Sequence, residues 1–431
     1  MMALGISNSR SGHNPCKLPP QKNVICSFWL KGRCSRNPCR FLHPDTSIQQ
    51  PTQVPNQHLD GSIKTQPHIT VCNYWVSGSC TYGDKCRYLH SWFHCDEDNR
   101  SLSMLARLEG HKKAISGVGL PSGSDKLYSG AKDGTVRVWD CIAGDCVKII
   151  NTGGEIGCLI SDGRWVFIGL PNTVKVWKLD VITGDYEEYV VDGAVRQVHA
   201  MAVCNGRLLA GSQDGVISVW RGSCDVNAFQ LVASLEAHAG PVLSLSVQLD
   251  RSILFSSSTD GTIKVWDLNN LQCIQTLSGH KDTVTCLLCS NEFLFSGSLD
   301  NTIKVWFTNQ AGCFELAYTH EEGCGVVALF GMADADGKPV LFSSCKDSSV
   351  RVYDLPSFKK RATLFSRKEV VAFQSGPGGL FFLGDGTGTV SVWNWIADQE
   401  TCLSNFSAFC DRIEDIGVQG GDTKVKDREV K

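Results

Sequence analysis

Two groups of three cysteines and one histidine lie in the first hundred residues, and their spacing is nearly the same. The first reads C-x7-C-x4-C-x3-H and the second reads C-x7-C-x5-C-x3-H. Three thiolates and one imidazole complete a closed tetrahedral shell around Zn²⁺, which leaves no position open for a substrate. The spacing predicts two structural zinc sites with these ligands: Cys26, Cys34, Cys39 and His43 in the first, and Cys72, Cys80, Cys86 and His90 in the second.

Each of these units spans fewer than 20 residues, which is too few to bury a hydrophobic core. Zinc therefore has to supply the folding free energy, on the order of 10–16 kcal/mol in comparable small fingers. Buried core thiols are the alternative explanation of the cysteines. They would not repeat the ligand order together with matching glycine, arginine and leucine positions, which are Gly32 and Gly78, Arg40 and Arg87, and Leu42 and Leu89.

Both units resemble CCCH-type zinc fingers, a family that binds single-stranded RNA and, for some members, is proposed to bind DNA. The resemblance implies that aromatic rings near the ligands stack on unpaired bases, and the matching positions are Phe41, Tyr82 and Tyr88. The first finger has Arg36 in place of Tyr82, and a guanidinium can also stack on a base.

Cations interleaved with these rings suit the phosphates of a single strand, although a merely solvated surface is the alternative. The cations that we expect to contact nucleic acid are Arg36, Arg40, Lys85 and Arg87, with Lys31 and Arg33 beside them. Two aromatic pairs near the ligands, Phe28-Trp29 and Tyr74-Trp75, either pack against the metal site or contact nucleic acid.

Most of the remaining chain repeats a short pattern that ends in an aromatic residue. In the copy from Asp260 to Asp267, an Asp-Gly turn leads into alternating apolar and polar residues, which is typical of a half-buried strand. Seven copies end at aromatic residues that are 38, 43, 46, 40, 47 and 40 positions apart. A fixed period of about 40–45 residues resembles the WD40 repeat, so seven copies imply a seven-bladed propeller.

The WD40 resemblance implies a buried hydrogen-bond chain through a histidine, a serine, an aspartate and an aromatic residue. The matching sets are His111, Ser129, Asp133 and Trp139; His238, Ser256, Asp260 and Trp266; His280, Ser296, Asp300 and Trp306; and, more weakly, His320, Ser343, Asp347 and Tyr353. His, Ser and Asp together could also indicate a hydrolase, but their recurrence at the blade period favours a scaffold. Repeats two, three and seven lack the histidine, and repeats two and seven also lack the aspartate, so we expect those blades to be the loosest.

The chain has 431 residues and a net charge of −3, which is unevenly distributed. Residues 1–100 carry 11 Lys and Arg against 6 Asp and Glu, a net charge of +5, so the remainder carries −8. A basic N-terminal part hints at a polyanionic partner. No secretory signal or membrane-spanning run is evident, so we expect reduced thiols and a nuclear or cytoplasmic, non-secreted protein.

We expect a mostly β architecture with six consecutive parts. They are a disordered N-terminus (1–25), finger one (26–43), a flexible linker (44–71), finger two (72–90), the propeller (101–398) and a polar tail (399–431). The WD40 family's circular closure further implies that the strand at Ser101–Leu108 completes the last blade.

The combined order of fingers and repeats resembles a plant family of CCCH zinc-finger/WD-repeat proteins over nearly all of residues 26–396. The resemblance implies a non-enzymatic adaptor whose fingers bind single-stranded RNA and whose propeller recruits a protein partner. A DNA-binding transcriptional regulator is one alternative. A substrate receptor of a ubiquitin ligase is another alternative, and it is disfavoured because no blade end reads Trp-Asp-x-Arg. Closed metal shells and the lack of a glycine-rich phosphate loop before a helix argue against an enzyme. We expect no small-molecule substrate and no membrane partner.

Overall fold

A computed structural model describes residues 71–95, 102–180, 183–222, 229–290, 292–310, 312–334 and 336–395. The chain divides into two compact units, Met1–His68 and Ile69–Lys431, and all described residues belong to the second. The expectations for residues 1–70, which include finger one and most of the linker, and for the tail at 399–431 lie outside the described residues. Within the described part, finger two contains α1 (Asn73–Val76) and the 3-10 turn η1 (Gly83–Lys85), followed by the short strand β1 (Phe93–Cys95).

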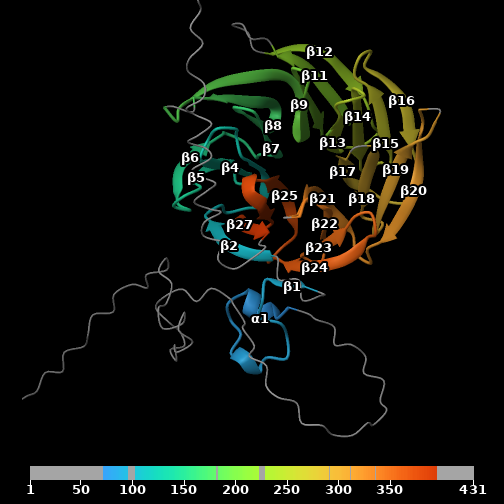
Figure 1. The fold of residues 1–431 in the computed structure, drawn as a ribbon. Coiled ribbons are helices and arrows are strands. Elements are labelled where there is room, and N and C mark those ends of the chain that lie inside the picture. The colour runs from blue at the N-terminus through green and yellow to red at the C-terminus, as the bar shows by residue number, and fades with distance from the viewer. Residues whose placement is uncertain are drawn as a thin grey trace, which may run out of the picture. The chain divides into compact units, whose positions relative to one another are not determined.

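The rest of the described chain is almost entirely β-strand and forms a ring of antiparallel sheets (Figure 1). Seven groups of four strand segments follow one another among the described residues, and we call each group a blade. Blade one contains β3 (Ile115–Gly119), β4 (Lys126–Ala131), β5 (Thr135–Asp140) and β6 (Cys146–Asn151). The predicted seven-bladed, mostly β propeller is confirmed.

Blades two and three share two long strands. β8 (Trp165–Leu179) reverses at Asn172, whose φ of 64° lies in the left-handed region, and so supplies two segments of blade two. β9 (Tyr186–Cys204) pairs with β8 through its first part and with β10 through its last part, so it joins the two blades. The other strands of these blades are β7 (Cys158–Asp162), β10 (Arg207–Ser212), β11 (Val216–Gly222) and β12 (Phe229–Glu236).

Blades four to six are regular four-stranded units. Blade four contains β13 (Val242–Gln248), β14 (Ile253–Ser258), β15 (Ile263–Asp267) and β16 (Gln272–Leu277). Blade five contains β17 (Val284–Ser290), β18 (Phe293–Ser298), β19 (Thr302–Thr308) and β20 (Phe314–Glu321). Blade six contains β21 (Val326–Ala333), β22 (Pro339–Cys345), β23 (Ser349–Asp354) and β24 (Lys359–Phe365).

Blade seven joins the two ends of the ring. It consists of β25 (Val370–Ser375), β26 (Leu380–Asp385) and β27 (Thr389–Trp395), with the turn η2 (Pro377–Gly379) between the first two. Its outer strand is β2 (Leu102–Glu109), which pairs antiparallel with β27 from Leu102↔Trp395 to Glu109↔Thr389. The predicted closure is confirmed, and it protects an edge of β27 that would otherwise be open to another chain.

Three of the four predicted hydrogen-bond chains are present. In blade one, Trp139 Nε1 donates to Ser129 Oγ at 2.8 Å, and His111 Nε2 lies 2.9 Å from the same oxygen. His111 Nδ1 lies 3.2 Å from Asp133 Oδ2, so the chain runs from the core to the turn. The same contacts occur in two further sets: His238, Ser256, Asp260 and Trp266, and His280, Ser296, Asp300 and Trp306.

The fourth predicted set is wrong in its histidine. His320 lies on β20, and its ring packs against the rings of Phe358 and Tyr353. Glu322, four residues before the buried Val326 of β21, instead occupies the position that the histidines hold before their blades. Glu322 accepts a hydrogen bond from the Tyr353 hydroxyl at 3.0 Å and pairs with Arg351. A carboxylate and a guanidinium replace the histidine chain in this repeat.

Repeat seven has a turn carboxylate, but it does not stand at the position where the repeat pattern places the aspartate. Asp385, at the end of β26, lies two residues before the position of the missing aspartate and is buried. Its Oδ1 accepts the N–H groups of Thr387 and Thr389 at 2.8 and 3.1 Å. The same kind of cap therefore closes this turn from the preceding strand, which removes one reason for expecting a loose blade.

The buried histidines predict how propeller stability depends on pH. Burial lowers the pKa of His111, His238 and His280 below its ordinary value of 6.5, and this outweighs the attraction of the neighbouring aspartates. An unfolded chain therefore binds protons at these positions first, and the free energy of unfolding falls as pH drops below about 6.5. We expect urea unfolding to give a lower stability at pH 5 than at pH 7.

The variant His280→Asn isolates this effect from acid release of zinc. Its stability at pH 7 should be lower than that of the parent, but its loss between pH 7 and pH 5 should be smaller. A parent stability that stays constant or rises between pH 7 and pH 5 would contradict the prediction.

Candidate metal centre and nucleic-acid interface

Finger two is a short loop whose two ends are held together. Val71 forms a parallel bridge with Leu89, and Cys72 N donates to Leu89 O at 2.8 Å. This contact places Cys72 beside the residue that follows Leu89, which is His90. Gly78, with a φ of 77°, ends the turn after α1 in a conformation that favours glycine. The glycine repeated between the two fingers thus has a structural reason in finger two.

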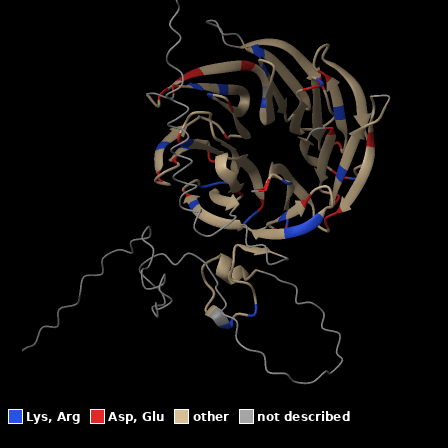
Figure 2. Ribbon diagram, in the orientation of Figure 1, with Lys and Arg blue, Asp and Glu red and all other residues tan. Residues whose placement is uncertain are grey.

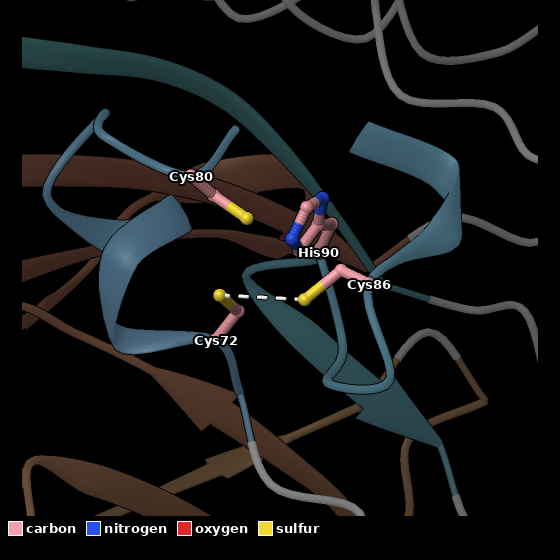
Figure 3. A group of neighbouring side chains, drawn as sticks. All are labelled: Cys72, Cys80, Cys86 and His90. Atoms are coloured by element: carbon pink, nitrogen blue, oxygen red, sulfur yellow. Dashed lines mark hydrogen bonds between the residues drawn. The ribbon is translucent and has the colours of Figure 1, made fainter. Parts of the chain in front are cut away.

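The structure brings the four predicted ligands of finger two into one cluster (Figure 3). The ligand atoms of Cys72, Cys80, Cys86 and His90 all lie within 4.8 Å of one another. Cys86 Sγ is 3.7 Å from Cys72 Sγ. A tetrahedral zinc ion with Zn–S bonds of about 2.3 Å would separate two sulfurs by about 3.8 Å. His90 Nε2 is buried without a hydrogen-bond partner, as expected for a ligand nitrogen. The donor set and its spacing fit Zn²⁺.

The surroundings of Cys72 favour the thiolate form, which is the form that binds a metal. Burial opposes ionisation, but backbone N–H groups of Trp75 and Tyr74 and the thiols of Cys86 and Cys80 outweigh it, so the pKa of Cys72 falls below its ordinary value. The N–H groups at the start of α1 therefore favour a negative charge on this sulfur.

An aromatic layer supports the cluster from one side. Trp75 stacks on the His90 ring with a centroid distance of 5.7 Å and an interplanar angle of 14°, and it also contacts Trp92 at 4.9 Å. Tyr74, the other member of the pair, is 70% exposed. The sequence left open whether Tyr74 and Trp75 pack against the metal site or contact nucleic acid. In the structure, Trp75 packs against the metal site, whereas Tyr74 faces solvent.

Three tyrosines and two cations are exposed on the small surface of finger two. Tyr82 is 71% exposed and Tyr88 is 51% exposed, and Lys85 and Arg87 are also exposed. The structure therefore leaves the predicted contact residues of finger two available to a ligand, and it adds Tyr74. The corresponding predictions for finger one, namely its ligands Cys26, Cys34, Cys39 and His43 and its contacts Phe41, Arg36 and Arg40, lie outside the described residues.

Finger two is joined to the propeller by a strand that sequence reasoning missed. β1 adds to the outer edge of blade six and pairs antiparallel with β24, with Phe93 opposite Leu364 and Cys95 opposite Ala362. Phe365 N donates to Trp92 O at 2.8 Å and extends the pairing by one residue. The Trp92-Phe93 pair, which begins two residues after the last ligand, was the available signal, since two large apolar residues outside a metal site require another surface to pack on.

Side chains strengthen this junction. The Arg107 guanidinium lies over the Trp92 ring at 4.4 Å, and Phe93 meets Trp393 edge-on at 6.2 Å. Arg367 Nε donates to Val76 O, at the end of α1, at 3.1 Å. The contacts Trp75–Trp92 and Trp92–Arg107 therefore form a continuous path from the metal site to blade seven.

A ring of WD-type blades that carries a three-cysteine, one-histidine cluster at its edge defines a class: CCCH zinc-finger proteins built on a WD40 propeller. Models of known families agree. A "WD domain, G-beta repeat" model matches residues 102–140, 229–267 and 271–306. A "CCCH-type zinc finger" model matches residues 70–91, and a "ZAP-like CCCH zinc finger" model matches residues 21–64. Both finger models imply Zn²⁺.

Full-length relatives then give the family. The chain is 46% identical over 408 residues to zinc finger CCCH domain-containing protein 17 of Oryza sativa subsp. japonica, covering 87% of this chain and 92% of the relative. It is 42% identical to protein 48 of the same designation from Arabidopsis thaliana, covering 88% of this chain and 93% of that relative. For Arabidopsis protein 63, the identity is 43% and the coverages are 89% and 93%. The chain belongs to this plant family of CCCH zinc-finger proteins with WD40 repeats.

The zinc-finger and WD40 matches suggest nucleic-acid binding and protein interaction, and none of the matches points to an enzymatic function. Among the described residues, no helix has the length and apolar character needed to cross a membrane.

Proposed function

We propose that this protein is a non-enzymatic adaptor that binds single-stranded RNA through its two zinc fingers and a protein partner through its propeller. The observation that carries the first half is the exposure of Tyr74, Tyr82 and Tyr88 together with Lys85 and Arg87 around a closed metal cluster. Rings that stack on bases and cations that meet phosphates are what a single-strand site requires.

Each finger would hold one Zn²⁺, and the ions would be structural. In finger two, Cys72, Cys80, Cys86 and His90 would fill all four positions, so no substrate could reach the metal. Finger one offers the same ligand types at nearly the same spacing. We expect the protein to act in the nucleus or cytoplasm, where these thiols stay reduced.

The proposed protein partner is supported by the family and by the outer strand of blade one. Ile142, Val147 and Ile149 are exposed on and beside β6. An exposed apolar edge strand is a surface on which a partner chain can pair and pack.

A DNA-binding transcriptional regulator is the second candidate, because bases of either nucleic acid could stack on the same tyrosines. The experiment that separates the two titrates the full-length protein with RNA and DNA strands of one sequence. Tighter binding of RNA supports the proposal, whereas equal or tighter binding of DNA overturns the RNA assignment.

The tyrosines of finger two predict the effect of substitution on RNA binding. The double variant Tyr82→Ala/Tyr88→Ala removes two stacking surfaces, each of which typically contributes about 1–3 kcal/mol. We expect RNA affinity to fall at least tenfold, with zinc content unchanged because neither ring is a ligand. Phe41→Ala should cost less, since it removes one ring from finger one, which has Arg36 in place of a second.

The matched control is Tyr318→Ala, which removes a 46%-exposed tyrosine from β20 of the propeller and should leave RNA affinity unchanged. Fluorescence anisotropy of one labelled RNA with all four proteins measures the effect, after metal content has been checked. An equal or larger loss from Phe41→Ala would reverse the ranking of the two fingers.

A further inference from the structure

A row of exposed cations begins where finger two contacts the propeller. Arg367 lies in the loop between β24 and β25, and its Nε donates to Val76 O of finger two while its side chain remains 39% exposed. Lys368, the next residue, is also exposed. Positive charge is therefore present on the propeller at the edge of the finger.

Two neighbouring loops extend this row towards blade one. Gly386, in the turn between β26 and β27, packs on Lys368, because a Cβ built on this glycine would lie 3.0 Å from Lys368 Cβ. Gly388 in the same turn packs on the loop between β2 and β3, since its Cβ would lie 2.6 Å from His111 O and 2.7 Å from Lys113 O. Lys112 and Lys113 are exposed in that loop. We call the set Arg367, Lys368, Lys112 and Lys113 the basic rim.

Three of the carboxylates near the basic rim are already engaged, and a fourth, Glu369 beside Lys368, is half-buried. Asp133 Oδ2 accepts Lys112 N at 2.8 Å, and Asp385 is buried beneath its turn. Glu109 lies 3.6 Å from Arg107 and 3.7 Å from Arg367. Across the described parts of the chain, no ion pair involves the side chains of Lys112, Lys113 or Lys368. Three lysine charges therefore face solvent on a body whose net charge is negative.

The most continuous basic stretch of the propeller is a less suitable surface for a polyanion. It lies at the start of β24 and comprises Lys359, Lys360 and Arg361 (Figure 2). Arg361 donates to Asp334 Oδ2 at 2.7 Å and also pairs with Asp354, and both lysines have interaction partners. The charge of Arg361 is therefore compensated within the protein, which makes this stretch less available to a polyanion than the basic rim.

We propose that a single RNA strand bound to finger two continues across the basic rim of the propeller. This inference rests on the proposed function and extends its site. Finger two supplies rings and two cations, whereas the rim supplies four exposed cations on loops that pack together at Gly386 and Gly388. Single-strand sites combine stacking platforms with a positive track along the phosphates, and together the two surfaces provide both parts.

RNA is favoured over an acidic peptide because the rim begins at the contact with finger two. Arg367 touches the finger directly, and the exposed Tyr74 lies on the same short helix as Val76. A strand stacked on the finger would therefore have its next phosphates near the rim. An acidic peptide has no bases to stack on the three tyrosines.

The test compares two charge-reversed double variants in the full-length protein. The rim variant is Lys112→Glu/Lys368→Glu. The control is Lys281→Glu/Arg251→Glu, which makes the same change of charge on blades five and four. Lys281 is the structural counterpart of Lys112, because the backbone N–H of each donates to the turn aspartate of its blade, at 2.9 and 2.8 Å.

Each protein is titrated with a short RNA of about 5 nucleotides and a long RNA of about 16 nucleotides, the upper range of single-strand sites. We expect the rim variant to bind the long RNA about tenfold more weakly than the parent and the short RNA equally well. Its slope of log K against log salt should be shallower by about 0.7 for each phosphate that the variant no longer neutralises. The control variant should match the parent for both RNAs.

Other outcomes overturn the inference in different ways. Equal losses in the rim and control variants would show a general charge effect, and no loss in the rim variant would remove the rim from the RNA path. A rim variant that loses binding to polyglutamate but not to RNA would assign the surface to an acidic peptide. A parent protein that binds neither RNA would refute the proposed function itself.

Discussion

Removal of zinc is expected to abolish RNA binding and to leave the propeller folded but less stable. Finger two has no hydrophobic core apart from its metal site, and zinc contributes on the order of 10–16 kcal/mol to the folding of comparable fingers. Without the ion, the tyrosines and cations of the finger lose their fixed arrangement. We expect a chelator to reduce RNA affinity at least 100-fold, because both fingers lose their structure together.

The propeller should respond because the finger is attached to it. Unfolding of finger two would remove Trp75 from its contact with Trp92 and the Val76 carbonyl from Arg367. An aromatic pair contributes about 0.5–1.5 kcal/mol and a hydrogen bond to a charged group about 1.5–3 kcal/mol. At about 2–4 °C per kcal/mol for domains of 150–250 residues, and less for larger ones, the melting temperature of the propeller should fall by several degrees.

Calorimetry and hydrogen exchange measure the two effects separately. Chelation should retain the propeller transition at a lower temperature and increase exchange at Phe365 N, which bonds to Trp92 O. Cys80→Ser should reproduce these effects for finger two without a chelator. Cys273→Ser, at an exposed cysteine of β16 outside the ligand set, should not. Loss of the whole propeller transition on chelation, or persistent RNA binding, would contradict the expectation.

The fold was largely predictable because similar local sequence signals recur in each repeat. The turn residues, which read Asp-Gly in three of the seven repeats, and the alternating strand before each aromatic residue fix the position of two strands per repeat. The period then sets the number of blades. His111, His238 and His280 each stand four residues before the buried first residue of an inner strand, namely Ile115, Val242 and Val284. These local signals depend on neighbours in sequence, so they can be read without the structure.

His320 was wrongly predicted because the prediction followed the residue type and not the distance of four residues from the inner strand. His320 stands six residues before Val326, whereas Glu322 stands four before it and occupies the buried position. Asp385 was missed in a similar way, because it caps its turn from the end of the preceding strand. Counting from the first buried residue of each blade would have identified Glu322.

The junction between finger and propeller could not be read from local sequence. β1 has three residues, too few to show a periodic pattern, and it is a strand only because β24 offers an unpaired edge. Its partner lies more than 260 positions away, at 362–364. The basic rim is likewise made by three loops that meet only when blades six, seven and one close the ring.

Glu322→Ala is expected to destabilise the propeller strongly, because Glu322 holds a buried charge network. Its side chain is fully buried, pairs with Arg351 and accepts the Tyr353 hydroxyl at 3.0 Å. Burial and the nearby Glu322 carboxylate hold the pKa of Tyr353 well above its ordinary value, so its hydroxyl stays protonated and donates. Asp347 also accepts from Arg351, at 2.8 Å, but this carboxylate is 42% exposed.

Removing one partner of a buried ion pair typically costs about 3–5 kcal/mol, because the other charge is left without compensation. Glu322→Ala would leave Arg351, whose side chain is 18% exposed, with its hydrogen bond to the backbone carbonyl of residue 322 and with the solvent-facing Asp347 as its remaining carboxylate partner. We therefore expect the free energy of unfolding, measured in urea at pH 7, to fall by about 3–5 kcal/mol. Glu321→Ala, at the exposed neighbouring residue, is the matched control and should change it by less than about 0.5 kcal/mol. Glu322→Gln keeps an acceptor for Tyr353 and should fall between the two. If Glu322→Ala and Glu321→Ala cost the same, this network does not replace the histidine chain of the other blades.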